Sequence, residues 1–184
     1  MILPTALPWL RVILTGTVSN QSDQRVFHEL VEETNLLGEL LATARDRCHV
    51  VVVDTPPGLS ETVHRVLEAS QHVIVPLQCE PLALQTTPQI LRGIQDVAAM
   101  NEELTLDGLV LTMYDAESPA SVRVVDYVRQ HLPRNMILDV VVPRSVACAE
   151  AFAAGQPVVL REPTDPSAHA YTNLATLLAD RLQS

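Results

Sequence analysis

The stretch VVVDTPPGLS, residues 51–60, carries a run of valines into a carboxylate and a stiff turn. An aspartate at the end of a buried strand can hold Mg²⁺ beside a nucleotide phosphate, directly or through water. Here that aspartate is Asp54. Pro56 and Pro57 restrict the backbone that follows, and Gly58 frees it to bend. The pattern leaves two interpretations open for Asp54, a magnesium ligand or a residue that closes a turn.

Short apolar runs alternate along the chain with longer helical patterns. The predicted extended segments are residues 10–15, 49–53, 72–75, 109–112, 137–142 and a short piece at 158–160. The predicted helices share an apolar face at helical spacing or a capping start. They are one capped by Ser22 with Val26, Phe27, Leu30 and Val31; one through Leu36, Leu37, Leu40 and Leu41; one from Ser60 through Leu67; ones starting at Thr87-Pro88 and Ser118-Pro119; residues 147–154, ended by Gly155; and residues 167–182.

Apolar strands that alternate with helices predict an α/β fold, a mostly parallel sheet flanked by helices. The length suits a single domain, residues 1–184. Ligands of such sheets bind beyond the carboxyl ends of the strands, which is where Asp54 is expected.

Composition limits the possible partners. The formal net charge is −10, which disfavours nucleic acid and anionic membranes. All 12 basic residues are arginines, so a mechanism that needs a lysine must borrow it from another chain. The N-terminus does not resemble a signal peptide, and no apolar stretch is long enough to span a membrane. The three cysteines show no paired spacing, which indicates reduced thiols in a cytoplasmic protein without a zinc site.

Five motifs in one order extend over nearly the whole chain: DTPPG, VIVPLQCEPLALQTTPQILRGI, LDGLVLTMYDAESPASVRVVDYV, VVPRSVACAEAFAAGQPVVL and DPSAHAYTNLATLLADRL. Together they resemble the ParA/Soj branch of the ParA/MinD partition ATPases, which have a P-loop NTPase fold. The resemblance implies ATP and Mg²⁺ as family cofactors, chromosome partitioning or plasmid segregation as the activity, and a cytoplasmic, nucleoid-associated location.

The resemblance also assigns roles to individual residues. Asp54 would lie near Mg²⁺, and Pro56, Pro57 and Gly58 would form the switch turn. The base of the nucleotide would lie near Thr112-Met113 and Pro143-Arg144. Nonspecific DNA contacts would come from exposed arginines. The candidates are Arg123, Arg129, Arg144 and Arg161, although an ordinary solvated charge is the favoured interpretation of each.

One expected piece is missing. The family's glycine-rich phosphate loop follows GxxxxGK[ST], with backbone N–H groups that cradle phosphates and a lysine that neutralises them. The six glycines here are isolated, and the chain has no lysine. The sequence is therefore expected to begin downstream of that loop, before the segment Thr17-Val18-Ser19-Asn20, as a fold truncated at its N-terminus. Nucleotide affinity of the chain alone should then be negligible, and Mg²⁺ binding by Asp54 alone weak.

Four hypotheses follow. The chain is a partition ATPase homologue that cannot bind ATP by itself and acts through an intact ParA-like partner; or an ATPase whose P-loop comes from another chain; or an inactive fragment; or an unrelated α/β binding module. A ParB-like protein or a cargo adaptor is the further partner that the resemblance implies. Whether the chain is an enzyme by itself stays open, with inactivity expected.

The missing loop also has a consequence for the sheet. In P-loop proteins of this kind, the strand that feeds the loop is central and lies beside the strand that ends in the Mg²⁺ aspartate. Its absence would leave unpaired backbone groups and an open apolar edge. Either the remaining strands rearrange, or the edge is covered by a partner or a second copy. A homodimer or higher assembly is the favoured outcome.

Overall fold

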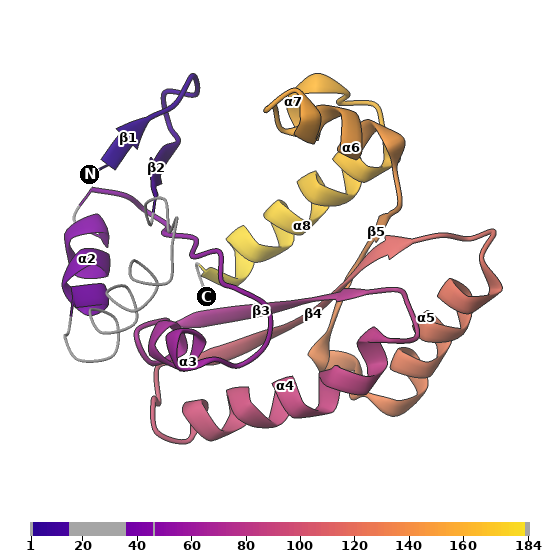
Figure 1. The fold of residues 1–184 in the computed structure, drawn as a ribbon, viewed down its shortest axis with the longest axis horizontal. Helices are drawn as coiled ribbons and strands as arrows, with labels where there is room; N and C mark the ends of the chain where they lie inside the picture. The colour runs from indigo at the N-terminus through magenta and orange to yellow at the C-terminus, as the bar shows by residue number, and fades with distance from the viewer. Residues whose placement is uncertain (1, 15–35, 46, 183–184) are drawn as a thin grey trace, which may run out of the picture.

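A parallel sheet of three strands organises the computed structural model, which describes residues 2–14, 36–45 and 47–182. The strands are β3 (His72–Gln78), β4 (Thr105–Tyr114) and β5 (Ile137–Pro143), in the order β3-β4-β5. Helices cover both faces of this sheet (Figure 1). The predicted α/β class, a mostly parallel sheet flanked by helices, is therefore confirmed.

The central strand β4 is buried because its two faces meet different helices. Leu109 and Leu111, both fully buried, face a cluster built with α3 (Glu61–Glu68), α4 (Ala83–Ala98) and α5 (Pro119–His131). Val110 faces the opposite cluster, where Leu138 and Ala170 pack. Ala170 belongs to α8 (Pro166–Leu182), which runs across the other face of the sheet. This two-sided burial explains the continuous apolar run in the sequence.

A bulge near the start of β4 depends on glycine. The register with β3 shifts between Val73 and Ile74, so that Val73 pairs with Leu106 and Ile74 with Gly108. Gly108 has φ +141°, and a Cβ there would lie 3.1 Å from the carbonyl oxygen of Met136. A side chain at this position would meet both backbone strain and a close neighbour.

The first described residues form a separate hairpin. β1 (Ile2–Pro4) pairs antiparallel with β2 (Arg11–Ile13). The predicted strand at residues 10–15 is thus found in part, but the antiparallel partner was not foreseen. The helix α2 (Leu36–Arg45) follows the predicted leucine pattern. The helix predicted after Ser22 lies outside the described residues, as does the segment Thr17–Asn20.

One predicted helix start is wrong. The helix expected from Thr87-Pro88 begins earlier, at Ala83, and contains Pro88; the Thr87 hydroxyl donates to the carbonyl oxygen of Ala83 at 2.7 Å. A tight turn at Glu80 allows this earlier start, since the carbonyl oxygen of Glu80 accepts from the N–H of Ala83 at 3.0 Å.

The extended piece expected at residues 158–160 is instead the short helix α7 (Val158–Arg161). Pro157 stands directly before it, and its carbonyl oxygen accepts from Leu160 and Arg161. Proline suits the start of a helix because its φ is preset and it needs no N–H partner there. The C-terminal helices were otherwise foreseen: α6 (Val146–Ala153) ends before Gly155, which has φ +63°.

The strand predicted at residues 49–53 is also corrected. The segment has no strand assignment and pairs with no described strand. Val52 is 87% exposed and Val50 is 55% exposed, so the apolar run lies on the surface. The composition of a buried strand is present, but no neighbouring described strand supplies its hydrogen bonds.

Two serines at helix starts give a matched test of capping. The Ser118 hydroxyl accepts from the N–H of Ser121 at the start of α5, whereas Ser60 makes no side-chain bond at the start of α3. Ser118→Ala is expected to lower the free energy of unfolding by about 1 kcal/mol, and Ser60→Ala to leave it within about 0.5 kcal/mol. Urea denaturation of both variants measures this, and equal losses would contradict the assignment.

Candidate functional site at the carboxyl end of the sheet

The carboxyl ends of all three sheet strands are joined by hydrogen bonds. The N–H of Cys79, just after β3, donates to the carbonyl oxygen of Thr112 at 2.8 Å. The N–H of Arg144, just after β5, donates to the carbonyl oxygen of Tyr114 at 2.7 Å. Thr112 and Tyr114 both belong to β4, so this strand connects the other two at their ends.

An ion pair spans the same edge. Arg144 Nη2 lies 2.8 Å from Glu80 Oε1, and both side chains are half exposed. Such a pair between exposed groups contributes at most about 1 kcal/mol. It does hold the turn after β5 beside the turn after β3, so that the guanidinium of Arg144 stays at this edge.

A backbone conformation of unusual type lies in the middle of the edge. Met113 has φ +56° and is the one non-glycine residue with positive φ among the described residues. Its side chain is partly exposed, between Thr112 and Tyr114, which are both half buried. Residues held in this region cluster at ligand sites because the surrounding structure must enforce the strain.

The hydroxyl of Ser121 and the thiol of Cys79 lie next to this edge. Ser121 is buried and accepts through its hydroxyl from the N–H of Asp115 at 3.0 Å. Burial raises the pKa of the Cys79 thiol, and a hydrogen bond with Ser121 opposes that rise in part. The thiol therefore stays protonated and serves as packing rather than as a nucleophile.

Thr112, Met113, Pro143 and Arg144, predicted as one region, lie together at this edge, because their strands are neighbours and their ends are bonded. Sequence reasoning missed Glu80, Cys79 and Ser121 as members. The signal for the first two was available in the motif VIVPLQCEP, where they directly follow the strand.

The predicted switch turn is exposed, and its following helix is fixed. Asp54, Pro56 and Pro57 are exposed, and Gly58 has φ +90°. Asp54 has no hydrogen bond or ion pair to any residue that the structure describes. Leu59 then packs onto the core against α4, where a Cβ on Gly93 would clash with Cδ1 of Leu59.

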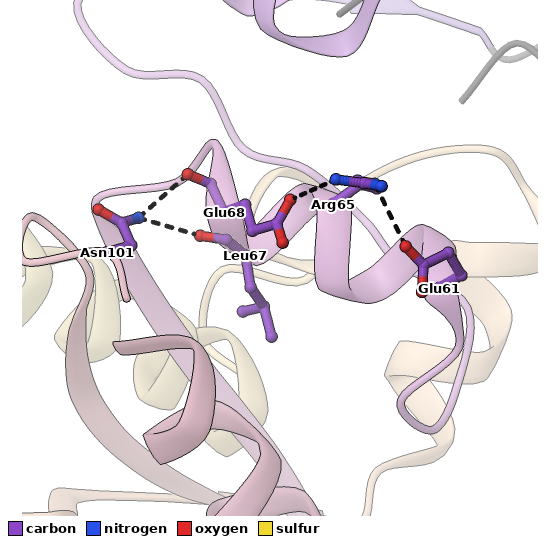
Figure 2. A network of polar contacts seen from close by, with 5 residues as sticks. All are labelled: Glu61, Arg65, Leu67, Glu68 and Asn101. Carbon is purple, nitrogen blue, oxygen red and sulfur yellow. Dashed lines mark hydrogen bonds and ion pairs between the residues drawn. The ribbon is translucent and has the colours of Figure 1, made fainter. Parts of the chain in front are cut away.

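The far end of α3 is anchored by Asn101 (Figure 2). Its side-chain amide donates to the carbonyl oxygens of Leu67, Glu68 and Ser70 at 3.1–3.3 Å. Arg65 within α3 pairs with Glu61 at 3.2 Å and Glu68 at 3.0 Å. The turn from Asp54 to Gly58 therefore leads into a helix that is held at both ends.

A single carboxylate such as that of Asp54 can hold Mg²⁺ only together with phosphate oxygens and water. Among residues 2–14, 36–45 and 47–182, no group of three His, Cys, Asp or Glu side chains could hold a metal ion. The chain also has no lysine to neutralise a phosphate. The described residues thus form no metal cage from protein side chains alone, and they include no lysine.

The predicted DNA contacts, Arg123 and Arg129, lie exposed on α5. They are six residues apart in one helix, and Asp126 lies between them in the sequence.

No described helix is long and apolar enough to cross a membrane.

The sequence profile of the AAA domain family matches residues 2–106. The chain is 37% identical to the chromosome partitioning protein ParA of Caulobacter vibrioides, over 71% of this chain and 49% of that protein. It is 31% identical to the sporulation initiation inhibitor protein Soj of Bacillus subtilis, over 78% of this chain and 56% of that protein. The chain belongs to the ParA/Soj branch of the ParA/MinD family, and it spans about half the length of these relatives.

Solved structures agree on the fold. The cell division ATPase MinD of Pyrococcus furiosus superposes with a TM-score of 0.73 at 21% identity, over 97% of this chain and 69% of that chain. Cobyrinic acid a,c-diamide synthase of Mycobacterium smegmatis, solved with an ATP analogue and magnesium, superposes with a TM-score of 0.68 at 28% identity. That match covers 88% of this chain and 61% of the synthase chain.

The positive φ of Met113, near the carboxyl end of β4, can be tested by substitution. Met113→Ile puts a β-branched side chain into a left-handed conformation and should lower the free energy of unfolding by about 1 kcal/mol or more. Met113→Gly should leave it unchanged or slightly higher, since glycine adopts this φ without strain. Thermal or urea denaturation of the two variants distinguishes them, and an equal loss in both would argue against the assigned conformation.

Proposed function

We propose that this chain is a single ParA-like domain that takes part in chromosome or plasmid partitioning, or in cargo positioning, without binding ATP by itself. Family membership supports the partitioning role. The sequence supports the second part, because it holds neither the glycine-rich loop nor any lysine. The phosphates of a nucleotide bound to this chain would therefore lack the hydrogen-bond donors that the family's phosphate loop supplies.

The edge at the carboxyl ends of β3, β4 and β5 is the proposed nucleotide-facing surface. Thr112, Met113, Pro143 and Arg144 would lie toward the base, with Arg144 held by its ion pair with Glu80. Asp54 would contribute its carboxylate to Mg²⁺, and Pro56, Pro57 and Gly58 would move as the switch. Two observations support this role: Asp54 is exposed and has no hydrogen bond or ion pair to any described residue, and the helix α3 that follows the turn is anchored by Asn101. A switch turn must move on a fixed base.

The chain is proposed to act through an intact ParA-like protein or a second copy, together with a ParB-like protein or cargo adaptor. An intact partner would bring the phosphate loop and its lysines. The proposed location is the cytoplasm, in contact with the nucleoid. The DNA contribution of this chain is proposed to be weak and nonspecific.

The chain alone is expected to show no saturable binding of Mg–ATP at micromolar concentrations and no hydrolysis above background. The reason is the absence of a lysine and of a glycine-rich cradle in its sequence. Isothermal titration and a phosphate-release assay measure the two quantities. Saturable micromolar binding that Asp54→Ala abolishes would refute the proposed deficit.

A second titration, with a ParA-like protein present, separates two versions of the proposal. If a complex binds ATP and Asp54→Ala in this chain weakens that binding, this chain contributes to a shared site. If the variant changes nothing, the chain acts only as a binding partner.

DNA binding is expected to be weak and to vanish as the salt concentration rises, because only arginine–phosphate contacts can supply it. Arg123→Glu and Arg129→Glu, each made singly, should weaken what remains at low salt, and together abolish it, whereas Arg134→Glu, a single change beyond α5 that alters the charge equally, should weaken it less than either. Fluorescence anisotropy over a salt series measures this. Tight binding that persists at physiological salt would contradict the expectation.

A further inference from the structure

The exposed side of α5 carries a stacked pair of rings. Tyr127 and His131 lie one helical turn apart, their ring centroids are 4.0 Å apart, and their planes are inclined by 17°. Tyr127 is 49% exposed, and His131 is exposed as well. The pair therefore presents aromatic surface to solvent rather than to the core.

The attachment of α5 to the sheet does not depend on these rings. The buried residues of α5 are Ser121, Val124, Val125 and Val128. The three valines lie in the same buried cluster as Leu109 and Leu111 of the central strand. Among the described residues, neither Tyr127 nor His131 belongs to a hydrophobic cluster. Packing on the sheet therefore does not account for the two rings.

A hydrogen bond within the helix fixes the imidazole of the pair. His131 Nδ1 lies 2.8 Å from the carbonyl oxygen of Tyr127. A carbonyl oxygen can only accept, so Nδ1 carries a proton and donates it. The bond and the stacking hold both rings in place before any ligand arrives. A preformed surface of this kind loses little side-chain freedom when a ligand stacks on it.

A guanidinium lies on the same side of the helix as the rings. Arg123 is exposed and precedes Tyr127 by four residues, just as Tyr127 precedes His131, and residues four apart are neighbours on a helix surface. We call Arg123, Tyr127 and His131 the α5 row. Arg129 lies about 200° around the helix axis from Tyr127, and Asp126 about 100°. The row thus combines one cation with two rings, and none of its three residues is acidic.

This combination matches the chemistry of a single-stranded nucleic acid. An unpaired base offers a flat face to an aromatic ring, and a backbone phosphate accepts hydrogen bonds from an arginine. A duplex keeps its bases stacked inside, so only its phosphates could reach the row. An acidic peptide would use Arg123 and leave the rings without a role.

We propose that the α5 row binds single-stranded nucleic acid, with a base on the Tyr127–His131 pair and a phosphate on Arg123. This deepens the proposed DNA contact of Arg123, on which it rests, and has no link to ATP binding. The formal net charge of −10 repels the backbone as a whole, so binding is expected at low salt and depends on stacking.

The test compares three labelled nucleic acids by fluorescence anisotropy at low salt. They are an oligothymidylate of about 15 nucleotides, an abasic strand of the same length and a duplex of the same length. The oligothymidylate should bind about fivefold more tightly than either of the others, since stacking adds about 1–3 kcal/mol per base. Equal binding of all three would overturn this proposal and leave the weak, nonspecific DNA contact standing. Absence of binding to all three would overturn both.

Variants separate the ring contribution from the charge contribution. Tyr127→Ala should weaken oligothymidylate binding about tenfold and leave the abasic strand within about twofold, whereas Tyr127→Phe keeps the ring and should change neither. Arg123→Glu should weaken both strands and lower the salt dependence by about 0.7 in log–log slope, which Tyr127→Ala should not. Arg129→Glu makes the same charge change on another side of α5 and should weaken binding less. A Tyr127→Ala variant that binds both strands as the unaltered chain does would refute the stacking.

A measurement on the unaltered chain covers the case in which Tyr127→Ala fails to fold. On addition of oligothymidylate, the ring protons of Tyr127 should shift in NMR spectra, because a stacked base changes their magnetic environment. The abasic strand should shift them much less. Ring signals that respond equally to both strands, or to neither, would refute the proposal.

Discussion

The pairing of β4 on both sides is the constraint on which the rest of the structure depends. A buried strand must satisfy its N–H and C=O groups on each side, and β4 does so through β3 and β5. Because it is central, its faces can bury Leu109 and Leu111 against one set of helices and Val110 against α8. The same central position brings Cys79 and Arg144 to its carboxyl end, where the candidate site lies.

The sheet brings the residues of the candidate site together, but it does not supply phosphate-binding groups. The strand ends place a strained Met113 and an ion-paired Arg144 at one edge, which is the edge proposed to face the nucleotide base. They place no lysine and no glycine cradle there, and phosphate recognition needs such donors. Under the proposed function, a nucleotide base would meet this edge but its phosphates would find no lysine, so we separate the family's role from the activity of this chain alone.

Much of this arrangement could be predicted from the sequence, since continuous apolar strands and capped helices carry local signals. Ser118-Pro119 marked the start of α5 correctly because the hydroxyl cap and the preset φ of proline act within a few residues. Thr87-Pro88 carried the same signal and misled, because a turn at Glu80 started the helix earlier. The valines at residues 50–53 have strand composition, yet strand formation needs a neighbour that local sequence does not encode.

For the candidate site as well, the sequence predicted which segments belong together but not the contacts between distant residues. The family resemblance grouped Thr112-Met113 with Pro143-Arg144, and the structure places Thr112 and Arg144 at one edge. The ion pair between Arg144 and Glu80 joins residues 64 positions apart, and no local pattern predicts such a contact. The support of Ser121 beneath the edge likewise arises only when α5 packs on β4.

Amide hydrogen exchange of the dilute chain, with and without Mg–ATP, tests the central claim most directly. The account predicts that amides of β4 exchange slowest, that residues 50–56 exchange fast, and that Mg–ATP changes neither. Slower exchange at residues 54–58 and 112–113 on addition of Mg–ATP would contradict it.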